Sequence, residues 1–335
     1  MHVRLRVGLA MALVALALPA AAPAASVFTR VIGEFEPERV IFYEAGAGEA
    51  NRLVVRDFEG DPFQARFVEA GAPLTVLPDC VAHAGALPFA VCPTGPMQID
   101  LGDRGDVALL TGQLPHQLLV TLNAGEGDDE VVADAGLAVV FGGGGNDRIR
   151  LGGNIFRGTA DGGPGRDVIL GGPLGHHLIG GPGDDLILNQ GASGPPSVDG
   201  NEGNDVLRLH YVPPAGDPPF ATGGPGNDVL FVARPDVPVP EPGEQLFSWR
   251  LSGDDGEDVL VGGASADFFE AGAGNDVLIT RDANAEFVDC GAGFDIAYAD
   301  ADDTLVSCEV RLNLALARVT RLRSELDRMA HDRIG

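Results

Sequence analysis

The 335-residue sequence contains no lysine, and this absence excludes several kinds of chemistry. The chain has no lysine that could form a Schiff base and none that could bind phosphate in a P-loop. Aromatic residues make up only 6% of the sequence, which is little material for a conventional globular core. The catalytic patterns G-x-S-x-G and H-E-x-x-H are also missing. We therefore expect that the protein is not an enzyme.

Positive charge is scarce, and long apolar segments are missing after the first 25 residues. The sequence has 49 acidic residues against 22 arginines, which gives a formal net charge of −27. Such a surface repels nucleic acids and anionic membranes. No segment of the chain approaches the roughly 20 apolar residues that a membrane-spanning helix needs. We expect no nucleic-acid partner and no membrane span.

The N-terminus has the features of an export signal. Arg4 and Arg6 precede the apolar run Val7–Leu18, and small residues suited to cleavage follow around Ala24 or Ala25. A membrane anchor is the alternative, but twelve apolar residues are too few to span a bilayer. The sequence predicts a cleaved signal peptide over residues 1–25 and a secreted, extracellular protein.

The chain has only four cysteines: Cys80, Cys92, Cys290 and Cys308. In an oxidising compartment an even number of cysteines usually forms disulfides, and four cysteines allow three pairings. Closeness in the chain favours Cys80–Cys92 and Cys290–Cys308. A zinc site is the competing interpretation, but the short C-x₂₋₄-C spacing that it requires is absent.

Glycine and proline are abundant and together form about a fifth of the sequence. The hydrophobic fraction is nevertheless 45%, so the chain is not of the apolar-poor type that stays disordered. This combination favours a fold made of turns and short strands.

The central half of the chain contains internal repeats that are nine residues long. Four segments match the pattern G-G-x-G-x-D-x-U-x, in which U is a large apolar residue. They are GGGGNDRIR (142–150), GGPGRDVIL (162–170), GGPGDDLIL (180–188) and GGPGNDVLF (223–231). Five further segments depart from the pattern at one or two places. They are AGEGDDEVV (124–132), GNEGNDVLR (200–208), GDDGEDVLV (253–261), AGAGNDVLI (271–279) and CGAGFDIAY (290–298). All nine keep glycine at the fourth place and aspartate at the sixth.

The eighth place of the repeat is consistently aliphatic. In the eight strongest copies it is Val131, Ile149, Ile169, Ile187, Leu207, Leu230, Leu260 and Leu278. The ninth copy has Ala297 there. A hydrophobic fraction of 45% would place about four apolar residues at eight positions. We therefore expect these side chains to face inward and to stack as an aliphatic core.

On these repeats the sequence resembles the RTX, or haemolysin-type, calcium-binding repeat proteins. In that family each repeat forms a calcium-binding turn followed by a very short strand, and successive repeats wind into a right-handed parallel β-roll. The resemblance implies an all-β solenoid that holds Ca²⁺ between neighbouring turns. It also implies that the sixth-place aspartates are the metal ligands, namely Asp129, Asp147, Asp167, Asp185, Asp205, Asp228, Asp258, Asp276 and Asp295. Many members of the family use an uncleaved C-terminal export signal, whereas this chain is expected to use an N-terminal one.

The chemistry of the repeat points the same way. Glycines allow positive φ angles, so the backbone turns sharply and directs carbonyl oxygens into a concavity. Calcium takes six to eight oxygen ligands, which carbonyls and a few carboxylates can supply. A metal-free solenoid whose aspartates only form turns is the alternative. Carboxylates stacked about 4.8 Å apart would then repel by roughly 3 kcal/mol per pair at an effective dielectric of about 20.

The spacing of the aspartates predicts that the ions line one edge of the roll. Several sixth-place aspartates are 18 residues apart, which is two repeats and one full turn of a β-roll. The segments between them have lost the ligand, with Ala138 or His176 at the sixth place, while 262–270 keeps Asp267 and is ambiguous. Their inward positions remain apolar and are Val140, Leu178 and Phe269. We expect the adjacent His176 and His177 to form a surface pair without a catalytic or metal role.

The flanks of the repeats have different patterns. The N-terminal flank has candidate strands at Arg39–Tyr43, Arg52–Arg56, Leu74–Leu77 and Gln117–Leu122. The segment LGDRGDVAL at 101–109 is interpreted as a decayed repeat, and the proline-rich stretch Arg234–Glu244 as a loop or insertion. From Val310 onward, apolar residues follow a heptad and predict an amphipathic helix that docks on its own domain. They are Leu312, Ala315, Val319, Leu322, Leu326 and Met329.

The predicted organisation is a signal peptide (1–25), an N-terminal β-rich cap (26–122), the calcium-binding roll (123–300) and a C-terminal cap with the helix (301–335). Two functions remain open. One is a calcium-dependent structural or adhesive protein outside the cell. The other is a calcium-folded accessory module of a polysaccharide- or enzyme-associated system, whose glycan or protein partner the sequence does not identify.

Overall fold

The computed structural model describes residues 24–32, 38–77, 79–85, 87–115, 117–134, 136–153, 158–190, 196–210, 218–233, 248–263, 265–312 and 316–332. The predicted signal peptide lies outside this range apart from its last two residues, and it stays a prediction. The proline-rich stretch Arg234–Glu244 also lies outside the described residues.

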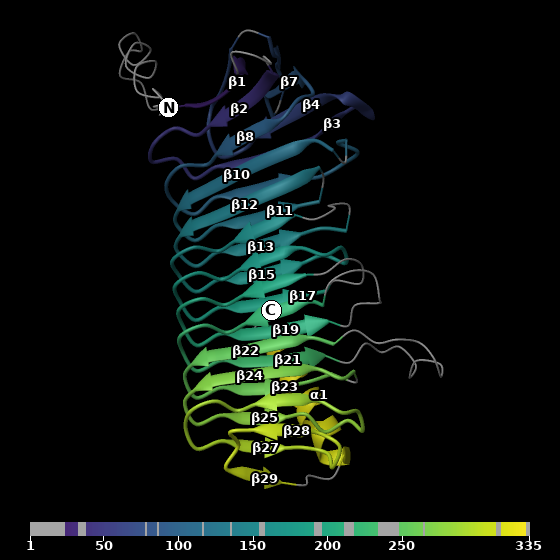
Figure 1. Ribbon diagram of the computed structural model, residues 1–335. Coiled ribbons are helices and arrows are strands. Elements are labelled where there is room, and N and C mark those ends of the chain that lie inside the picture. The colour runs from purple at the N-terminus through teal and green to yellow at the C-terminus, as the bar shows by residue number, and fades with distance from the viewer. Residues whose placement is uncertain are drawn as a thin grey trace, which may run out of the picture.

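The described residues form two long β-sheets that face each other (Figure 1). Sheet A has 14 strands within this part of the chain. In spatial order they are β28 (Thr304–Val306), β26 (Phe287–Asp289), β24 (Phe268–Ala273), β22 (Arg250–Asp255), β20 (Phe220–Thr222), β18 (Ser197–Asp199), β16 (His177–Ile179), β14 (Thr159–Asp161), β12 (Leu137–Gly144), β10 (Leu119–Glu126), β8 (Met97–Asp100), β2 (Glu38–Glu44), β1 (Ala25–Ile32) and β5 (Leu74–Val76).

Sheet B has 15 strands in the same described part of the chain. In spatial order they are β29 (Val310–Leu312), β27 (Ile296–Tyr298), β25 (Val277–Ile279), β23 (Val259–Val261), β21 (Val229–Ala233), β19 (Val206–His210), β17 (Leu186–Asn189), β15 (Val168–Gly171), β13 (Arg148–Leu151), β11 (Glu130–Ala133), β9 (Val107–Leu110), β3 (Arg52–Phe58), β4 (Asp61–Glu69), β7 (Phe89–Pro93) and β6 (Val81–His83).

The chain alternates between the two sheets, and each strand pairs in parallel with the strand two further along. We call one sheet A strand and the following sheet B strand a rung. This arrangement confirms the predicted all-β fold, a parallel β-solenoid of short repeats. The parallel stacking already begins at β2 and β3, which pair with β8 and β9. Beyond them, antiparallel strands β1, β4, β6 and β7 cover the N-terminal end.

Side chains from both sheets fill the narrow space between them. The predicted inward positions of sheet B, from Val131 to Leu278, are at most 1% exposed, and Ala297 is fully buried. Val140, Leu178 and Phe269 occupy the same inward column of sheet A and are also fully buried. The stacked aliphatic core is therefore confirmed. Because each fully buried aliphatic side chain contributes about 1.5–3 kcal/mol, this column supplies the main apolar stabilisation of a very thin fold.

Glycine allows neighbouring rungs to approach closely where the chain passes from sheet A to sheet B. Gly145, at the fourth place of its repeat, has a φ of 133°. A Cβ atom at this position would clash with the carbonyl oxygen of Gly127 in the preceding rung. Only glycine combines this backbone conformation with this contact, which explains why the fourth place is glycine in all nine copies.

The C-terminal helix α1 (Leu316–Asp332) folds back onto the outer face of sheet B, where it contacts β19 and β21. Docking was predicted, but two details of the prediction were wrong. The segment Val310–Leu312 is strand β29 rather than helix. Leu322, Leu326 and Ala330 pack against the sheet, whereas Met329 is 52% exposed, because a straight helix has 3.6 residues per turn and does not keep a heptad in contact.

Two disulfides link the four cysteines as predicted. Cys80 is bonded to Cys92 and Cys290 to Cys308. The first joins the turn before β6 to β7 in the N-terminal end of the solenoid. The second ties the end of β26 to the segment after β28, in the last two rungs.

Candidate metal-binding ladder

The sixth-place aspartates form one continuous ladder along the edge where the chain passes from sheet A to sheet B. We call this side the ladder edge, and the side where the chain returns from sheet B to sheet A the return edge. In Figure 1 the ladder edge is the even column of turns on the left. The backbone N–H of each aspartate donates to Oδ1 of the aspartate in the next rung, over 2.7–2.9 Å. All nine predicted residues belong to this ladder and lie on a single edge.

The ladder has a tenth member outside the nine predicted aspartates. Asp106, in the segment interpreted as a decayed repeat, donates its N–H to Oδ1 of Asp129 at 2.7 Å. Its own Oδ1 accepts the N–H of Asn51 at 2.5 Å. At the other end, the N–H of Asp295 donates to Oε2 of Glu309 at 2.9 Å. Asn51 and Glu309 therefore terminate a ladder of ten aspartates.

Each ladder aspartate leaves its second carboxylate oxygen without a partner. Oδ2 of all ten is buried and makes no hydrogen bond, and the ten residues are at most 3% exposed. They are Asp106, Asp129, Asp147, Asp167, Asp185, Asp205, Asp228, Asp258, Asp276 and Asp295. A buried charged oxygen without a partner is strongly unfavourable. Its repetition in ten successive rungs indicates a missing partner rather than a local imperfection.

A backbone carbonyl faces the same space as this unpartnered oxygen. A Cβ atom on Gly142, at the first place of its repeat, would clash with both Oδ2 of Asp147 and the carbonyl oxygen of Gly162 in the next rung. The same arrangement recurs at Gly162, Gly180, Gly200 and Gly253. Carboxylate and carbonyl oxygens are the donors that Ca²⁺ prefers. The residues present therefore fit a hard cation held between two rungs.

Burial raises the pKa of every ladder carboxyl above its ordinary value. The N–H bond to Oδ1 lowers the pKa and the charges of neighbouring acids raise it, but burial has the largest effect. The pKa is about 6 for Asp106, Asp147 and Asp258, about 7 for Asp167, Asp185 and Asp228, and about 8 for Asp205. The highest values lie in the middle of the ladder. Without a cation, these carboxylates are therefore poorly stabilised in the charged form.

The equivalent positions on the return edge are built differently. Asp267 also precedes a strand, but Oδ1 accepts hydrogen bonds from the Trp249 N–H and the Ser265 hydroxyl, and Oδ2 accepts one from the Gly263 N–H. All three donors are neutral protein groups, so Asp267 acts as a turn former. The ambiguity left by the sequence is resolved by these contacts, since no ladder aspartate has a bonded Oδ2.

His176 occupies the same position four rungs earlier, and its expected surface location was wrong. The side chain is 1% exposed, and Nδ1 accepts the N–H of Gly158 at 3.0 Å. Burial lowers its pKa to about 4, so the ring is neutral near pH 7. His177 is exposed in β16, as expected. Successive side chains along an extended chain point to opposite faces of the sheet, so two adjacent histidines cannot both face solvent here.

A second set of side-chain bonds runs beside the ladder at the fifth place of the repeats. Oδ1 of Asp128 accepts the N–H of Asn146, and Oδ1 of Asp184 accepts the N–H of Asn204, at 2.7 and 2.9 Å. Oδ1 of Asn204 in turn accepts the N–H of Asn227 at 3.0 Å. These bonds run from each rung to the one before it, opposite to the aspartate ladder. The recurring G-N-D of the repeats is the sequence signal for these bonds, and they were not predicted.

Within the described residues, no three His, Cys, Asp or Glu side chains are grouped closely enough to bind a metal ion by themselves. Each step of the ladder instead offers one carboxylate oxygen and backbone carbonyls. This donor pattern recurs from rung to rung along the ladder. A profile described as the RTX calcium-binding nonapeptide repeat (4 copies) matches residues 123–155 and 250–284. The chain is an RTX-type β-roll protein.

The two matched segments contain Asp129 and Asp147, and Asp258 and Asp276. The RTX repeats between them continue the same ladder with the same unpartnered oxygens, although they lie outside the matched ranges. No curated protein and no solved structure matches the chain. In the described part of the chain, no helix has the length and apolarity needed to cross a bilayer.

Proposed function

We propose that this RTX-type protein is exported and binds Ca²⁺ along the ladder, in a structural or adhesive role outside the cell and without catalysis. The observation that supports calcium binding is the row of ten buried, unpartnered Oδ2 atoms. These oxygens and the first-place carbonyls would hold the ions, and the ions would supply the positive charge that the ladder lacks. The two disulfides and the RTX repeats, which are typical of secreted proteins, support an extracellular location.

Calcium binding is expected to be coupled to folding. The strands are only three to eight residues long over most of the roll, and the charged ladder opposes its own assembly. We expect circular dichroism in EDTA to show loss of the β signal, and millimolar Ca²⁺ to restore it, with Mg²⁺ much less effective because it requires a stricter octahedral geometry. An unchanged spectrum and melting curve after chelation would refute the proposal.

A matched pair of variants tests the ladder residues directly. Asp185→Asn keeps an Oδ1 acceptor for the Asp167 N–H but removes the charge, so the number of Ca²⁺ ions bound in isothermal titration should fall. Asp267→Asn makes the same change at the return edge, where both oxygens are already bonded, and should leave that number unchanged. Equal losses in the two variants would show that the ladder edge has no special role.

One observation favours the second candidate function, an accessory module that binds polysaccharide. Phe220, Arg250, Phe268 and Phe287 occupy successive rungs on the outer face of sheet A. The three rings are 38–45% exposed, and Phe268 lies 6.2 Å from Phe287 and 6.0 Å from the Arg250 guanidinium. Exposed, regularly spaced rings can stack on sugar faces. Calcium-dependent binding to a glycan array that is lost in Phe268→Ala would establish this role over a purely structural one.

A further inference from the structure

The return edge becomes acidic in the last rungs of the roll. The pairing of Phe268 with Phe287 and of Phe287 with Thr304 aligns the residues that precede them, which are Asp267, Glu286 and Asp303. Asp267 is fully bonded within its own turn, as described above. Glu286 and Asp303 lie outside the nonapeptide pattern, since neither has glycine two residues earlier. The chemistry of this cluster is therefore separate from that of the ladder.

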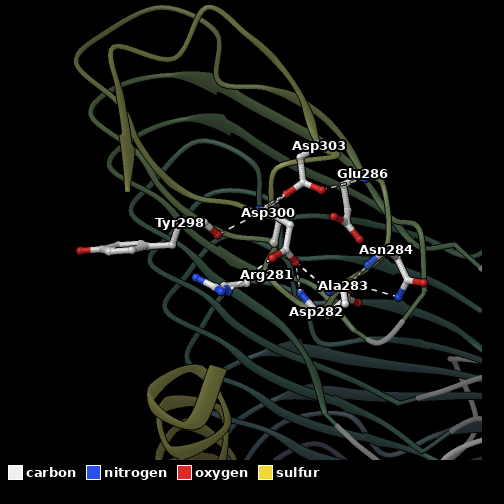
Figure 2. Close-up of polar contacts among 9 residues, drawn as sticks. Arg281, Asp282, Ala283, Asn284, Glu286, Tyr298, Asp300 and Asp303 are labelled. Atoms are coloured by element: carbon white, nitrogen blue, oxygen red, sulfur yellow. Dashed lines mark hydrogen bonds and ion pairs between the residues drawn. The ribbon is translucent and has the colours of Figure 1, made fainter. Parts of the chain in front are cut away.

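Neutral donors fix the Asp303 carboxylate. Oδ2 accepts hydrogen bonds from the Thr280 hydroxyl at 2.9 Å and the Asp300 N–H at 2.7 Å, and Oδ1 accepts one from the Glu286 N–H at 3.2 Å (Figure 2). None of these donors carries a charge. The negative charge of Asp303 is thus held in place beside the Glu286 backbone without being neutralised.

The nearby Arg281 pairs with Asp300, and its buried Nη1 makes no hydrogen bond. Nε of Arg281 lies 3.3 Å from Oδ1 of Asp300, and Oδ2 of Asp300 accepts the N–H groups of Asp282 and Ala283 at 2.9 and 2.7 Å. Asp282 has one oxygen bonded to the backbone and side-chain N–H groups of Asn284, at 2.8 and 3.1 Å. Figure 2 shows these residues around the Glu286 side chain.

Glu286 has no partner of its own. The residue is 4% exposed, and both Oε1 and Oε2 are buried without a hydrogen bond. Its carboxyl group lies against the carboxylates of Asp303 and Asp282. Burial, followed by these two acids, raises its pKa strongly above the ordinary value. Because carboxylates have no proton to donate, such contacts are repulsive unless a positive charge or a proton is shared among them.

A single proton cannot neutralise three neighbouring carboxylates. A protonated Glu286 could donate to one neighbour only, which would leave two carboxylates charged and one Oε atom still unpartnered. A divalent cation can contact several carboxylates at once and offset two charges. Calcium accepts irregular oxygen cages, whereas smaller ions demand stricter geometry. The side chains are not grouped as a ready-made cluster, so the cation would draw them together.

We propose that Glu286, together with Asp282 and Asp303, binds one Ca²⁺ ion at the return edge, in a side-chain site distinct from the RTX ladder. The ion joins the turn before β26 to the turn before β28. The ion therefore stabilises the last rungs at their return edge, whereas the aspartate ladder lies on the opposite edge. The Cys290–Cys308 disulfide ties the other end of the same two strands.

The test counts bound calcium on the full chain by equilibrium dialysis. Glu286→Gln keeps the size of the side chain and removes its charge, and we expect one ion fewer than in the unaltered protein. Asp267→Asn, one rung earlier on the same edge, is the matched control and should bind the full number.

Hydrogen exchange of β26 and β28 provides a second readout. Calcium should slow exchange there in the unaltered protein and much less in Glu286→Gln. If Glu286→Gln does not fold, Asp282→Asn is used instead, since its retained Oδ1 can still accept the Asn284 bonds. An unchanged ion count in Glu286→Gln, or in Asp282→Asn if that variant replaces it, overturns the site proposed at the return edge. A lower count in Asp185→Asn would still support the proposed ladder function. An unaltered protein that binds no calcium would contradict both.

Discussion

The N–H of Asp147 donates to Oδ1 of Asp167 at 2.7 Å, although the two residues are 20 positions apart in the chain. Asp167 makes the same bond to Asp185, at the same distance, across only 18 positions. The spacing reaches 30 between Asp228 and Asp258, where the bond is 2.8 Å. All of the extra residues lie between the end of a sheet B strand and the start of a sheet A strand. The return edge thus absorbs every insertion, and the ladder edge keeps a constant geometry.

An engineered insertion should show the same asymmetry. Gly-Ser placed between Pro173 and Leu174, at the return edge, should change the melting temperature in Ca²⁺ by only a few degrees, because loops tolerate added length. Gly-Ser placed between Gly163 and Pro164, at the ladder edge, should break the bond to Asp167 and lower the calcium count. Equal effects of the two insertions on the melting curve would contradict this account.

The metal-free protein should be more stable in mild acid than at alkaline pH. The folded-state pKa values of the central ladder carboxyls are about 7 to 8, above the unfolded value near 4. Their contribution to stability is therefore present below about pH 4 and is lost as pH rises through 7 to 8. Each unit of pKa shift corresponds to about 1.4 kcal/mol, so the combined loss from these four carboxyls is on the order of 10 kcal/mol or more.

Circular dichroism in EDTA measures this difference, and we expect the β signal to be retained at pH 5 and lost at pH 8. With Ca²⁺ present the trend should reverse, because the ion competes with protons for the same oxygens and binds more tightly as pH rises. Metal-free protein that is more stable at pH 8 than at pH 5 would argue against buried, charged ladder carboxylates.

Helix α1 should stabilise the middle of the roll through a few apolar contacts. Leu326 packs against the outer face of sheet B, which is formed by residues such as Leu188 and Phe231. Leu326→Ala should lower the free energy of unfolding by about 1–2 kcal/mol and increase the exchange of β19 and β21 amides. Met329→Ala, on the exposed side of the helix, should change it by less than about 0.5 kcal/mol. Similar losses in both variants would place the contact face elsewhere.

The C-terminal disulfide should stabilise the last rungs more than the rest of the chain. Cys290 and Cys308 are 18 residues apart, and closing a loop of this length stabilises by about 3 kcal/mol in the chain-entropy account. The double variant Cys290→Ser with Cys308→Ser should therefore show faster amide exchange in β26 and β28, with β11 and β13 unaffected. Uniformly faster exchange throughout the roll would mean that these rungs do not unfold separately.

Most of the roll could be predicted from the sequence because its repeat is strict. Aspartate at the sixth place and an aliphatic residue at the eighth fix both the turn and the inward face, so Asp185 and Ile187 were placed correctly. The pairing of the cysteines also followed from their closeness in the chain. The two-residue excess between Asp147 and Asp167 was compatible with a constant ladder, as the hydrogen bonds show.

The features that were missed depend on contacts between residues distant in sequence. Asp106 lacks glycine at the fourth place, and Arg104 takes the required left-handed conformation instead, with a φ of 79°. Asn51 and Glu309 reach the ladder only through the folding of the two ends. Glu286 has no periodic signal, because its importance comes from Asp282 and Asp303 lying beside it in three dimensions.

The direction of the ladder bonds has a consequence for how the chain can assemble. Every ladder N–H is satisfied by a carboxylate that comes later in the sequence, from Asn51 through to Glu309. A chain can emerge from a ribosome or a translocation channel with its N-terminus first. The ladder N–H of its most recently formed rung then has no acceptor until the next rung has emerged. The C-terminal end of the growing roll therefore keeps one unpaired ladder N–H until Glu309 supplies the last acceptor.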